Sequence, residues 1–259
     1  MRQWIMLFAF AAAPVLPAIS AAAQPQPIVL DDKSSVDQIL DALHARGQGL
    51  KDFAGDVSIV ETDNLNGEQT TLRGKAWYQD RGEGNSRIRI VFDSKKVGDK
   101  PEKEYKQEYV LDKGWLIDRD FKRKKEVARQ VLKPGQKINL LKLGEGPFPL
   151  PVGQPREEVL KQFDVKRIES KKEDPQGTVH VELVPKPGTR FARKFKKLDV
   201  YVDTKTNFPR QVNTVDPRET GVRATDLGKI NVNVGVTDKD FKLDDIGNDW
   251  ERKTEAMEE

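Results

Sequence analysis

The sequence of 259 residues predicts a mainly β (α+β) fold built around a single large, curved antiparallel sheet. About ten or eleven short runs between residues 53 and 234 place apolar side chains at every second position, the period of a strand with one buried face. Turn signals such as Asn66-Gly67 separate neighbouring runs, and connections this short join antiparallel strands. Because helical segments are few, a sheet with so many strands has to roll up or be covered.

The beginning of the chain has the layout of a secretory signal. A positive end at Met1-Arg2 is followed by an apolar stretch and by three alanines that close at Ala23. We therefore expect the following division of the chain: a signal peptide over residues 1–23, a linker over 24–33, one domain over 34–250 and a polar C-terminal tail over 251–259.

Composition narrows the possible functions. The chain has no cysteine, which together with an export signal is typical of a bacterial periplasmic protein that folds without disulfides. Its 45 basic and 42 acidic residues nearly balance, to a net charge of +3. Such mixed charge argues against a dedicated nucleic-acid surface.

The first expected element is an amphipathic helix. Ser35 and Gln38 have the spacing of a capping box, and Gly47 ends the helical pattern. The apolar face of this helix consists of Val36, Ile39, Leu40 and Leu43. A face this narrow predicts a helix that lies on another element, and a sheet is the natural partner.

The strands follow in two series. The first series is predicted around residues 53–59, 72–78, 88–92, 109–111, 115–117 and 124–131. After a short helix at residues 156–162, the second is predicted at residues 165–168, 178–184, 198–202, 210–214, 222–227 and 229–234.

One strand carries small residues at two successive positions of its buried face, Gly74 and Ala76. They leave volume that a neighbouring element can fill by close approach, and the first helix is one such element. Alternatively, they spare an open cavity.

Residues for catalysis are scarce. The only histidines, His44 and His180, belong to no ligand cluster, and His180 alternates with valines in a strand as a surface or cap residue would. Asp118 and Asp120 resemble an acid and base pair but read as solvated loop charge. We expect neither an enzyme nor a metal or other cofactor.

The segment at residues 143–153 places five proline or apolar residues between glycines. Prolines hold an extended backbone without N–H donors, so Phe148 and Leu150 are expected to point into a hollow. A connection that clamps Phe148 into an ordinary core remains the alternative.

The order of these elements resembles the periplasmic lipoprotein carrier (LolA-like) family, over residues 36–244. Besides the capped helix, the resemblance is carried by GKAW at 74–77, LDKGWLI at 111–117, GPFPL at 146–150, VDTKTNFPR at 202–210 and GVTDKDF at 235–241.

The resemblance implies an incomplete barrel with helices over its mouth as a lid. It also implies a monomeric periplasmic carrier that takes acylated lipoproteins from an inner-membrane exporter to an outer-membrane receptor, with transient membrane contact. The acyl chains would lie in a cavity spared by Gly74 and Ala76. Its expected lining is Trp77, Ile88, Ile90, Phe92, Leu111, Trp115, Ile117, Phe148 and Leu150.

The family latches its lid with an arginine, and position suggests Arg81, with Arg87 and Arg89 as alternatives. Two rival functions stay open: a lipid- or protein-binding regulatory module of the cell envelope, and a secreted hydrolase that uses carboxylates.

Overall fold

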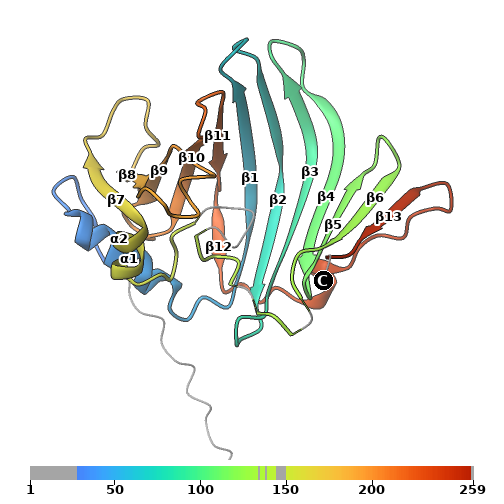
Figure 1. Ribbon diagram of the computed structural model, residues 1–259, viewed down its shortest axis with the longest axis horizontal. Helices are drawn as coiled ribbons and strands as arrows, with labels where there is room; N and C mark the ends of the chain where they lie inside the picture. The colour runs from blue at the N-terminus through green and yellow to red at the C-terminus, as the bar shows by residue number, and fades with distance from the viewer. Residues whose placement is uncertain (1–27, 134, 138, 144–149, 258–259) are drawn as a thin grey trace, which may run out of the picture.

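The computed structural model describes residues 28–133, 135–137, 139–143 and 150–257. Within these residues, thirteen strands form one sheet in the order β13-β6-β5-β4-β3-β2-β1-β11-β10-β9-β8-β7, and β12 pairs with β1 beside this path (Figure 1). The curved, unclosed sheet confirms the predicted fold class. The expected signal peptide lies outside the described residues.

The strands of the first half are β1 Asp52–Asp63, β2 Gln69–Asp80, β3 Ser86–Val97, β4 Lys103–Asp112, β5 Trp115–Asp120 and β6 Lys125–Gln130. Those of the second half are β7 Phe163–Ile168, β8 Thr178–Pro185, β9 Lys197–Asp203, β10 Pro209–Val215, β11 Gly221–Asp226, β12 Ile230–Val232 and β13 Glu251–Glu255. The helices are α1 Val36–Gly47, α2 Arg156–Gln162 and the 3₁₀ helix η1 Asp238–Phe241.

The sheet consists of two meanders that meet at its centre. Strands β1 to β6 pair in sequence order, as do β7 to β11, and β1 joins β11 in antiparallel fashion with Ser58 opposite Asp226. The pairing of β13 with β6 departs from the prediction because it is parallel, with Glu251 opposite Lys125. Part of the expected polar tail is therefore a strand at the edge of the sheet.

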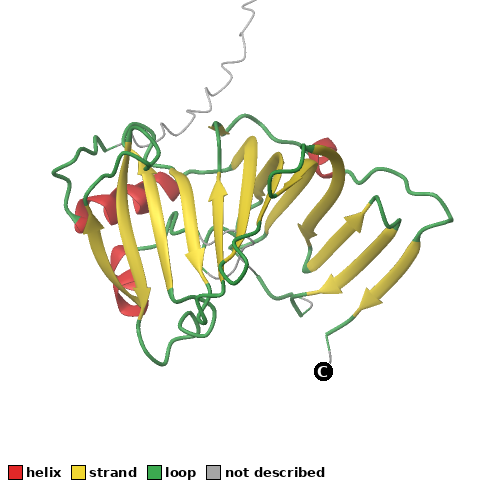
Figure 2. Cartoon of the chain, turned by 90° about the horizontal axis from the view of Figure 1, so that it is seen from above, coloured by secondary structure: helices red, strands yellow, loops and turns green. Residues whose placement is uncertain are grey.

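The register sorts side chains to two faces, which we name after two residues of β2. The inner face carries Ala76 and faces the hydrophobic core, and the outer face carries Lys75. The sheet bends strongly between its two ends, as the view from above shows (Figure 2).

Helix α1 begins as predicted. The Ser35 hydroxyl accepts from the Gln38 amide at 3.2 Å and the Gln38 side chain accepts from the Ser35 amide at 2.8 Å, the reciprocal bonds of a capping box. The buried side chains of α1 enter the same core as the inner faces of β8 and β9. Together these side chains are Ile39, Leu40, Leu43, Val179, Val181, Leu183, Leu198 and Val200.

Both α-helices lie at the β7 end of the sheet (Figures 1 and 2). They cover one end of the inner face, so the expected lid of helices does not extend over β2 to β5. Residues of the expected linker also join the fold, because Leu30 is buried and the Asn207 side chain donates to the Ile28 carbonyl at 2.7 Å. In the described part of the chain, no helix combines the length and apolar character needed to cross a bilayer.

Candidate ligand-binding hollow

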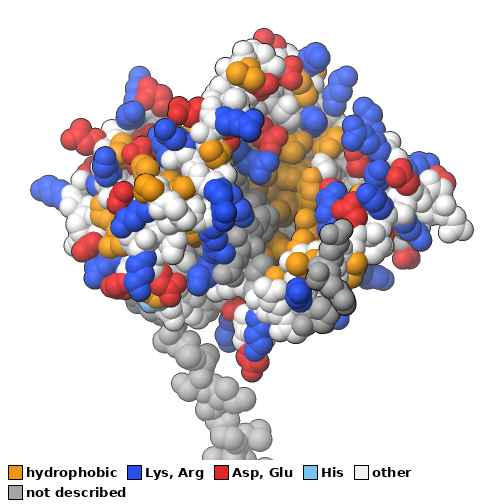
Figure 3. Space-filling model, in the orientation of Figure 1, with side chains coloured by type: hydrophobic (Ala, Val, Ile, Leu, Met, Phe, Trp, Pro, Cys, Tyr) orange, Lys and Arg blue, Asp and Glu red, His pale blue; other side chains and the backbone are white. Residues whose placement is uncertain are grey.

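A hollow lined by hydrophobic side chains opens over the middle strands of the sheet (Figure 3). Four of the residues predicted to line a cavity lie on the inner face of these strands and are almost fully buried: Ile88, Ile90, Phe92 and Leu111. The Tyr109 ring meets Phe92 edge-on, with 6.2 Å between the ring centroids. We call these four buried residues of the inner face the floor.

The margin of the hollow is only partly buried. Five apolar or aromatic side chains pack against the hydrophobic core and are only partly buried: Ile59, Leu72, Tyr105, Tyr109 and Leu116. The cross-strand pairs put them on the inner face, since Ile59 lies opposite Leu72, and Leu116 lies opposite Leu111. A partly exposed apolar margin beside a closed floor is where a hydrocarbon ligand would gain most contact.

Three predicted lining residues lie elsewhere. Trp77 lies opposite Arg89 and Ile117 lies opposite Val110, which puts both on the outer face, and Trp115 shares that face with Ile117. The Arg89 guanidinium lies 5.4 Å from the centroid of the Trp77 ring. Because neighbours along a strand point to opposite faces, these three residues do not line the hollow with Ala76 and Ile90.

A leucine-rich connection, of which the sequence analysis used only Phe148 and Leu150, contributes to the hydrophobic core. It contributes Leu140, Leu141, Leu143, Leu150 and Val152, all buried in the same cluster as Ile88 and Ile90. Of the two residues predicted from this stretch, Leu150 is completely buried and Phe148 lies outside the described residues. The signal that could have found the others is the apolar spacing at 140, 141 and 143.

The connection is fixed to α1 at Gly153. Its amide donates to the Leu43 carbonyl at 3.1 Å, and its carbonyl lies 3.1 Å from His44 Nδ1. A Cβ on Gly47 would lie 2.2 Å from the Gly153 Cα, so the two backbones touch and only glycine fits at residue 47. This contact ties the leucine-rich connection to the helical end of the molecule.

The small residues of β2 allow close approach of a neighbouring element, as one of the two expectations had it, but at Gly74 that element is β3 and not the first helix. A Cβ on Gly74 would lie 1.9 Å from the Val91 carbonyl oxygen, at a point where the register between β2 and β3 shifts. Glycine is therefore required by the approach of two backbones at a bulge. Ala76 is fully buried between Gly55 and Ile90, and the Gly55 position is itself closed by Ile230.

The three candidate latch arginines do not contact the α-helices in the described structure. Arg81 pairs with Asp112 at the neighbouring strand end. Arg87 is buried, contacts Asp238 and lies with its guanidinium 4.0 Å from the centroid of the Phe241 ring. Arg89 donates to the Asp240 carbonyl at 2.9 Å. Arg87 and Arg89 thus hold a C-terminal segment on the outer face.

We call this segment, residues 236–246, the strap. Besides Arg87 and Arg89, Arg119 on β5 donates to the Asp244 carbonyl at 2.7 Å. Beneath the arginines, the Glu108 carboxylate is 1% exposed and lies 2.6 Å from Arg89 and 3.8 Å from Arg119. The strap leads the chain across the outer face to β13, and the buried arginines anchor it.

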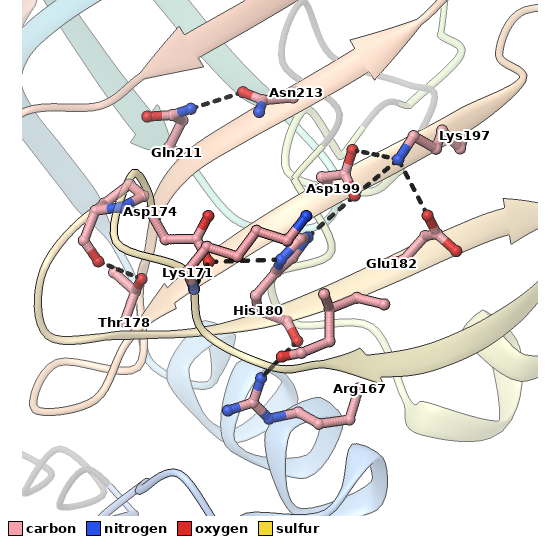
Figure 4. Close-up of polar contacts among 12 residues, drawn as sticks. Arg167, Lys171, Asp174, Thr178, His180, Glu182, Lys197, Asp199, Gln211 and Asn213 are labelled. Carbon is pink, nitrogen blue, oxygen red and sulfur yellow. Dashed lines mark hydrogen bonds and ion pairs between the residues drawn. The ribbon is translucent and has the colours of Figure 1, made fainter.

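His180 belongs to a buried polar network on the outer face of β8 and β9, where sequence reasoning expected a surface or cap residue (Figure 4). Its Nε2 lies 3.0 Å from an Asp199 oxygen, and its Nδ1 lies 3.9 Å from Asp174. The Lys197 ammonium lies 3.1 Å from an Asp199 oxygen and 3.0 Å from a Glu182 oxygen, so it joins the two carboxylates. Burial raises the pKa of Asp199, but hydrogen bonds from His180 and Lys197 outweigh it and hold the pKa below its ordinary value.

This network has the features of a structural ion cluster. Asp174 comes from the loop between β7 and β8, so the cluster fixes that loop on the sheet. The hydroxyl of Thr178, the first residue of β8, donates to the Pro175 carbonyl of the same loop at 2.6 Å (Figure 4). Among the described residues, no group of three or more His, Asp or Glu side chains is arranged to hold a metal ion.

The two carboxylates that resemble an acid and base pair in the sequence lie on the inner face. Asp118 accepts a hydrogen bond from the side-chain amide of Gln107 at 3.2 Å, and Asp120 accepts one from the backbone amide of Arg123 at 2.9 Å. Gln107 in turn contacts both Tyr105 and Tyr109 on its own strand. Asp118 thus continues a polar row beside the apolar floor.

No family model matches the chain, and neither does any curated protein. Solved structures similar to it include an uncharacterized conserved protein from Thermus thermophilus, with 11% identity and a TM-score of 0.47 over 84% of this chain and 97% of that one. Another is the MucA/MucB complex of Pseudomonas aeruginosa, with 12% identity and a TM-score of 0.45 over 80% of this chain and 60% of that one.

A LolA superfamily protein from Nitrosomonas europaea is also similar, with 12% identity and a TM-score of 0.33 over 81% of this chain and 98% of that one. A member of the superfamily that the sequence resembles is thus among the solved structures similar to this chain. These three similarities have identities of at most 12% and TM-scores of at most 0.47.

Proposed function

We propose that this protein is a non-enzymatic carrier of acylated molecules, with lipoproteins as its cargo, in the bacterial periplasm. The observation that supports it is the partly exposed apolar margin over the inner face of β1 to β5, beyond the reach of α1 and α2. We further propose that the protein is a monomer that carries its cargo from an inner-membrane exporter to an outer-membrane receptor and touches each membrane briefly. This part of the proposal is based on the family resemblance of the sequence.

The free energy needed to bring an acyl chain through water is consistent with a margin of this kind. Each methylene removed from water contributes about 0.8 kcal/mol, so an acyl chain of roughly 16 carbons loses on the order of 12 kcal/mol when it enters water unaided. A carrier has to offset much of that cost and still release its cargo. A partly covered margin on a rigid floor provides contact without full enclosure, which keeps release possible.

The proposed lining follows from the register. We keep the inner-face residues Ile88, Ile90, Phe92 and Leu111 as the floor and add the margin residues Ile59, Leu72, Tyr109 and Leu116. Trp77, Trp115 and Ile117 leave the proposed lining because they lie on the outer face. Leu150 contributes to the core beside the hollow, and Phe148 stays a prediction.

Two neighbours on β5 test the function. Leu116 faces the hollow and Ile117 faces the other way, and both are partly buried. In a displacement assay with a fluorescent fatty acid, we expect Leu116→Gln to weaken binding of a palmitoylated peptide by roughly tenfold, the cost of losing one well-placed apolar contact of about 1.4 kcal/mol.

Ile117→Gln is the matched control and should leave binding close to that of the natural protein. Urea unfolding of both variants separates loss of binding from loss of stability. The proposal fails if the natural protein binds neither the fatty acid nor the peptide, or if the two variants weaken binding equally.

A further inference from the structure

A second feature of the inner face is a basic cavity of about 580 Å³ between the β3–β4 and β5–β6 turns. Five cationic side chains line it: Lys95, Lys100, Lys103, Lys122 and Arg123. Two acids, Glu104 and Asp120, share the lining, which leaves three positive charges in excess. Lys and Arg side chains also gather on the rim of the hollow in the space-filling view (Figure 3).

Most of these cations lack an acidic partner. Among the described residues, no carboxylate lies within ion-pair distance of Lys95, Lys100, Lys103 or Lys122, and Arg123 reaches Asp120 only at 3.7 Å. Lys95 and Lys103 are direct cross-strand partners on β3 and β4. Like charges directly opposite each other destabilise a sheet, and an anion between them would remove that cost.

Side chains of β4 connect the basic cavity to the apolar residues of the inner face. Tyr105 lines the cavity and also packs against the hydrophobic core, while the Lys95 ammonium lies 5.3 Å from the centroid of its ring. The Tyr105 hydroxyl donates to Gln107 at 2.5 Å, and Gln107 contacts Tyr109, which meets Phe92 on the floor. One row of β4 side chains therefore leads from the cations to the proposed acyl site.

We infer that the basic cavity binds the phosphate of an anionic lipid while the acyl chain of the same molecule lies along Tyr109 and the apolar margin. This inference rests on the proposed function and narrows its ligand to lipids with a negatively charged head group. The excess of unpaired cations selects the charge, and the connection through β4 to the apolar residues selects a lipid over free phosphate.

The experiment compares two ligands with the same acyl chain, the anionic lysophosphatidic acid and the neutral monoacylglycerol, in the fatty-acid displacement assay at low salt. We expect the natural protein to bind the anionic ligand roughly tenfold more tightly, since a few exposed charge contacts of about 0.5 kcal/mol each add to that. Raising the salt concentration should shrink the difference.

A pair of double variants isolates the cavity. Lys95→Gln/Lys103→Gln should abolish the preference for the anionic ligand and leave monoacylglycerol binding unchanged. Lys75→Gln/Lys96→Gln removes the same charge from the outer face of β2 and β3 and should keep the preference. Equal loss in both double variants would show an effect of net charge alone and overturn the inference.

The remaining outcomes separate this inference from the proposed function. If the natural protein binds both ligands equally, the inference fails and the carrier function stands. If it binds neither ligand, the carrier function itself fails. Inorganic phosphate is the third ligand: binding of phosphate alone as tightly as lysophosphatidic acid would make the cavity a free-phosphate site and overturn the lipid assignment.

Discussion

Ala76 and Trp77 are adjacent in the chain, yet the pleat of β2 sends their side chains to opposite faces of the sheet. Choosing lining residues by hydrophobicity placed Trp77 in the hollow, whereas choosing by alternation from Ala76 would have excluded it. The large ring on the outer face is accounted for by its stack with Arg89, an ion pair partner of Glu108. Such a cation–π contact depends on the register between β2 and β3, which sequence does not reveal.

Gly74 gives a test at the same scale. Because a Cβ there would lie 1.9 Å from the Val91 carbonyl oxygen, we expect Gly74→Ala to lower the free energy of unfolding by roughly 1–3 kcal/mol or more. Gly221→Ala is the matched control in β11, since its Cβ would lie 3.2 Å from the Asp216 carboxylate and 3.8 Å from the Thr62 carbonyl oxygen, so a smaller loss is expected.

Urea unfolding measures both variants. A cavity-sparing role for Gly74 predicts the opposite result, with stability retained and fatty-acid binding reduced.

Among the elements, α1 and α2 follow local rules and the strap does not. The capping box of α1 lies within four residues of sequence, and the predicted helix at residues 156–162 matches the bounds of α2. The strap instead depends on contacts with Arg87, Arg89 and Arg119, which come from strands more than a hundred residues earlier. No local pattern announces such contacts, and the same holds for the parallel pairing of β13.

The buried Glu108 makes Arg89 the critical strap contact. Arg89→Leu leaves this carboxylate with only Arg119, at 3.8 Å, so we expect a loss of roughly 3–5 kcal/mol in the free energy of unfolding. Hydrogen exchange should also become faster at the amides of residues 236–246, because Arg89 holds the Asp240 carbonyl.

Two further variants control for this effect. Arg73→Leu removes an arginine from the same outer face, where its partner Glu102 is 42% exposed, and should cost at most about 1 kcal/mol. Arg89→Leu/Glu108→Leu removes both buried charges and should recover much of the stability. If the single and double variants are equally unstable, the buried pair is not the cause.

At the scale of the whole molecule, period-two alternation and turn residues predicted most of the strands close to where they lie. The order of the strands could not be predicted this way, because β1 pairs with a strand far away in the sequence: Ser58 lies opposite Asp226, 168 residues later. The hollow was expected from the family resemblance, and the register places Ile88, Ile90 and Phe92 on the inner face, where a role in binding stays a prediction. The leucine-rich border of the hollow lies in a connection, and its basic end combines strand residues with the β3–β4 and β5–β6 turns; the course of such connections depends on tertiary contacts.

Burial of the tyrosines gives the fold a defined response to alkaline pH. Burial raises the pKa of Tyr78, Tyr109 and Tyr201 to about 12 and also raises that of Tyr105, from an ordinary value of 10.0. The unfolded chain releases these protons first, so their contribution to stability is present below pH 10 and is lost as the pH rises from 10 to about 12.

Tyrosinate absorbance should therefore appear in the folded protein only well above pH 10, and the free energy of unfolding in urea should fall over the same interval. Tyr109→Phe should make this fall shallower, because one titrating group is gone. Tyrosinate absorbance with a midpoint at pH 10 in the folded protein would contradict the prediction.

The junction of β1 with β11 sets an order for folding. A chain that emerges with its N-terminus first makes β1 to β6 available before β11, and these six strands can form a complete meander because their neighbours in space are neighbours in sequence. The edge of β1 then stays unpaired until β11 is available, and an unpaired strand edge is a place where an incompletely folded chain aggregates. A chaperone that shields β1 until the second meander arrives would accordingly speed maturation more than one that acts on the finished protein.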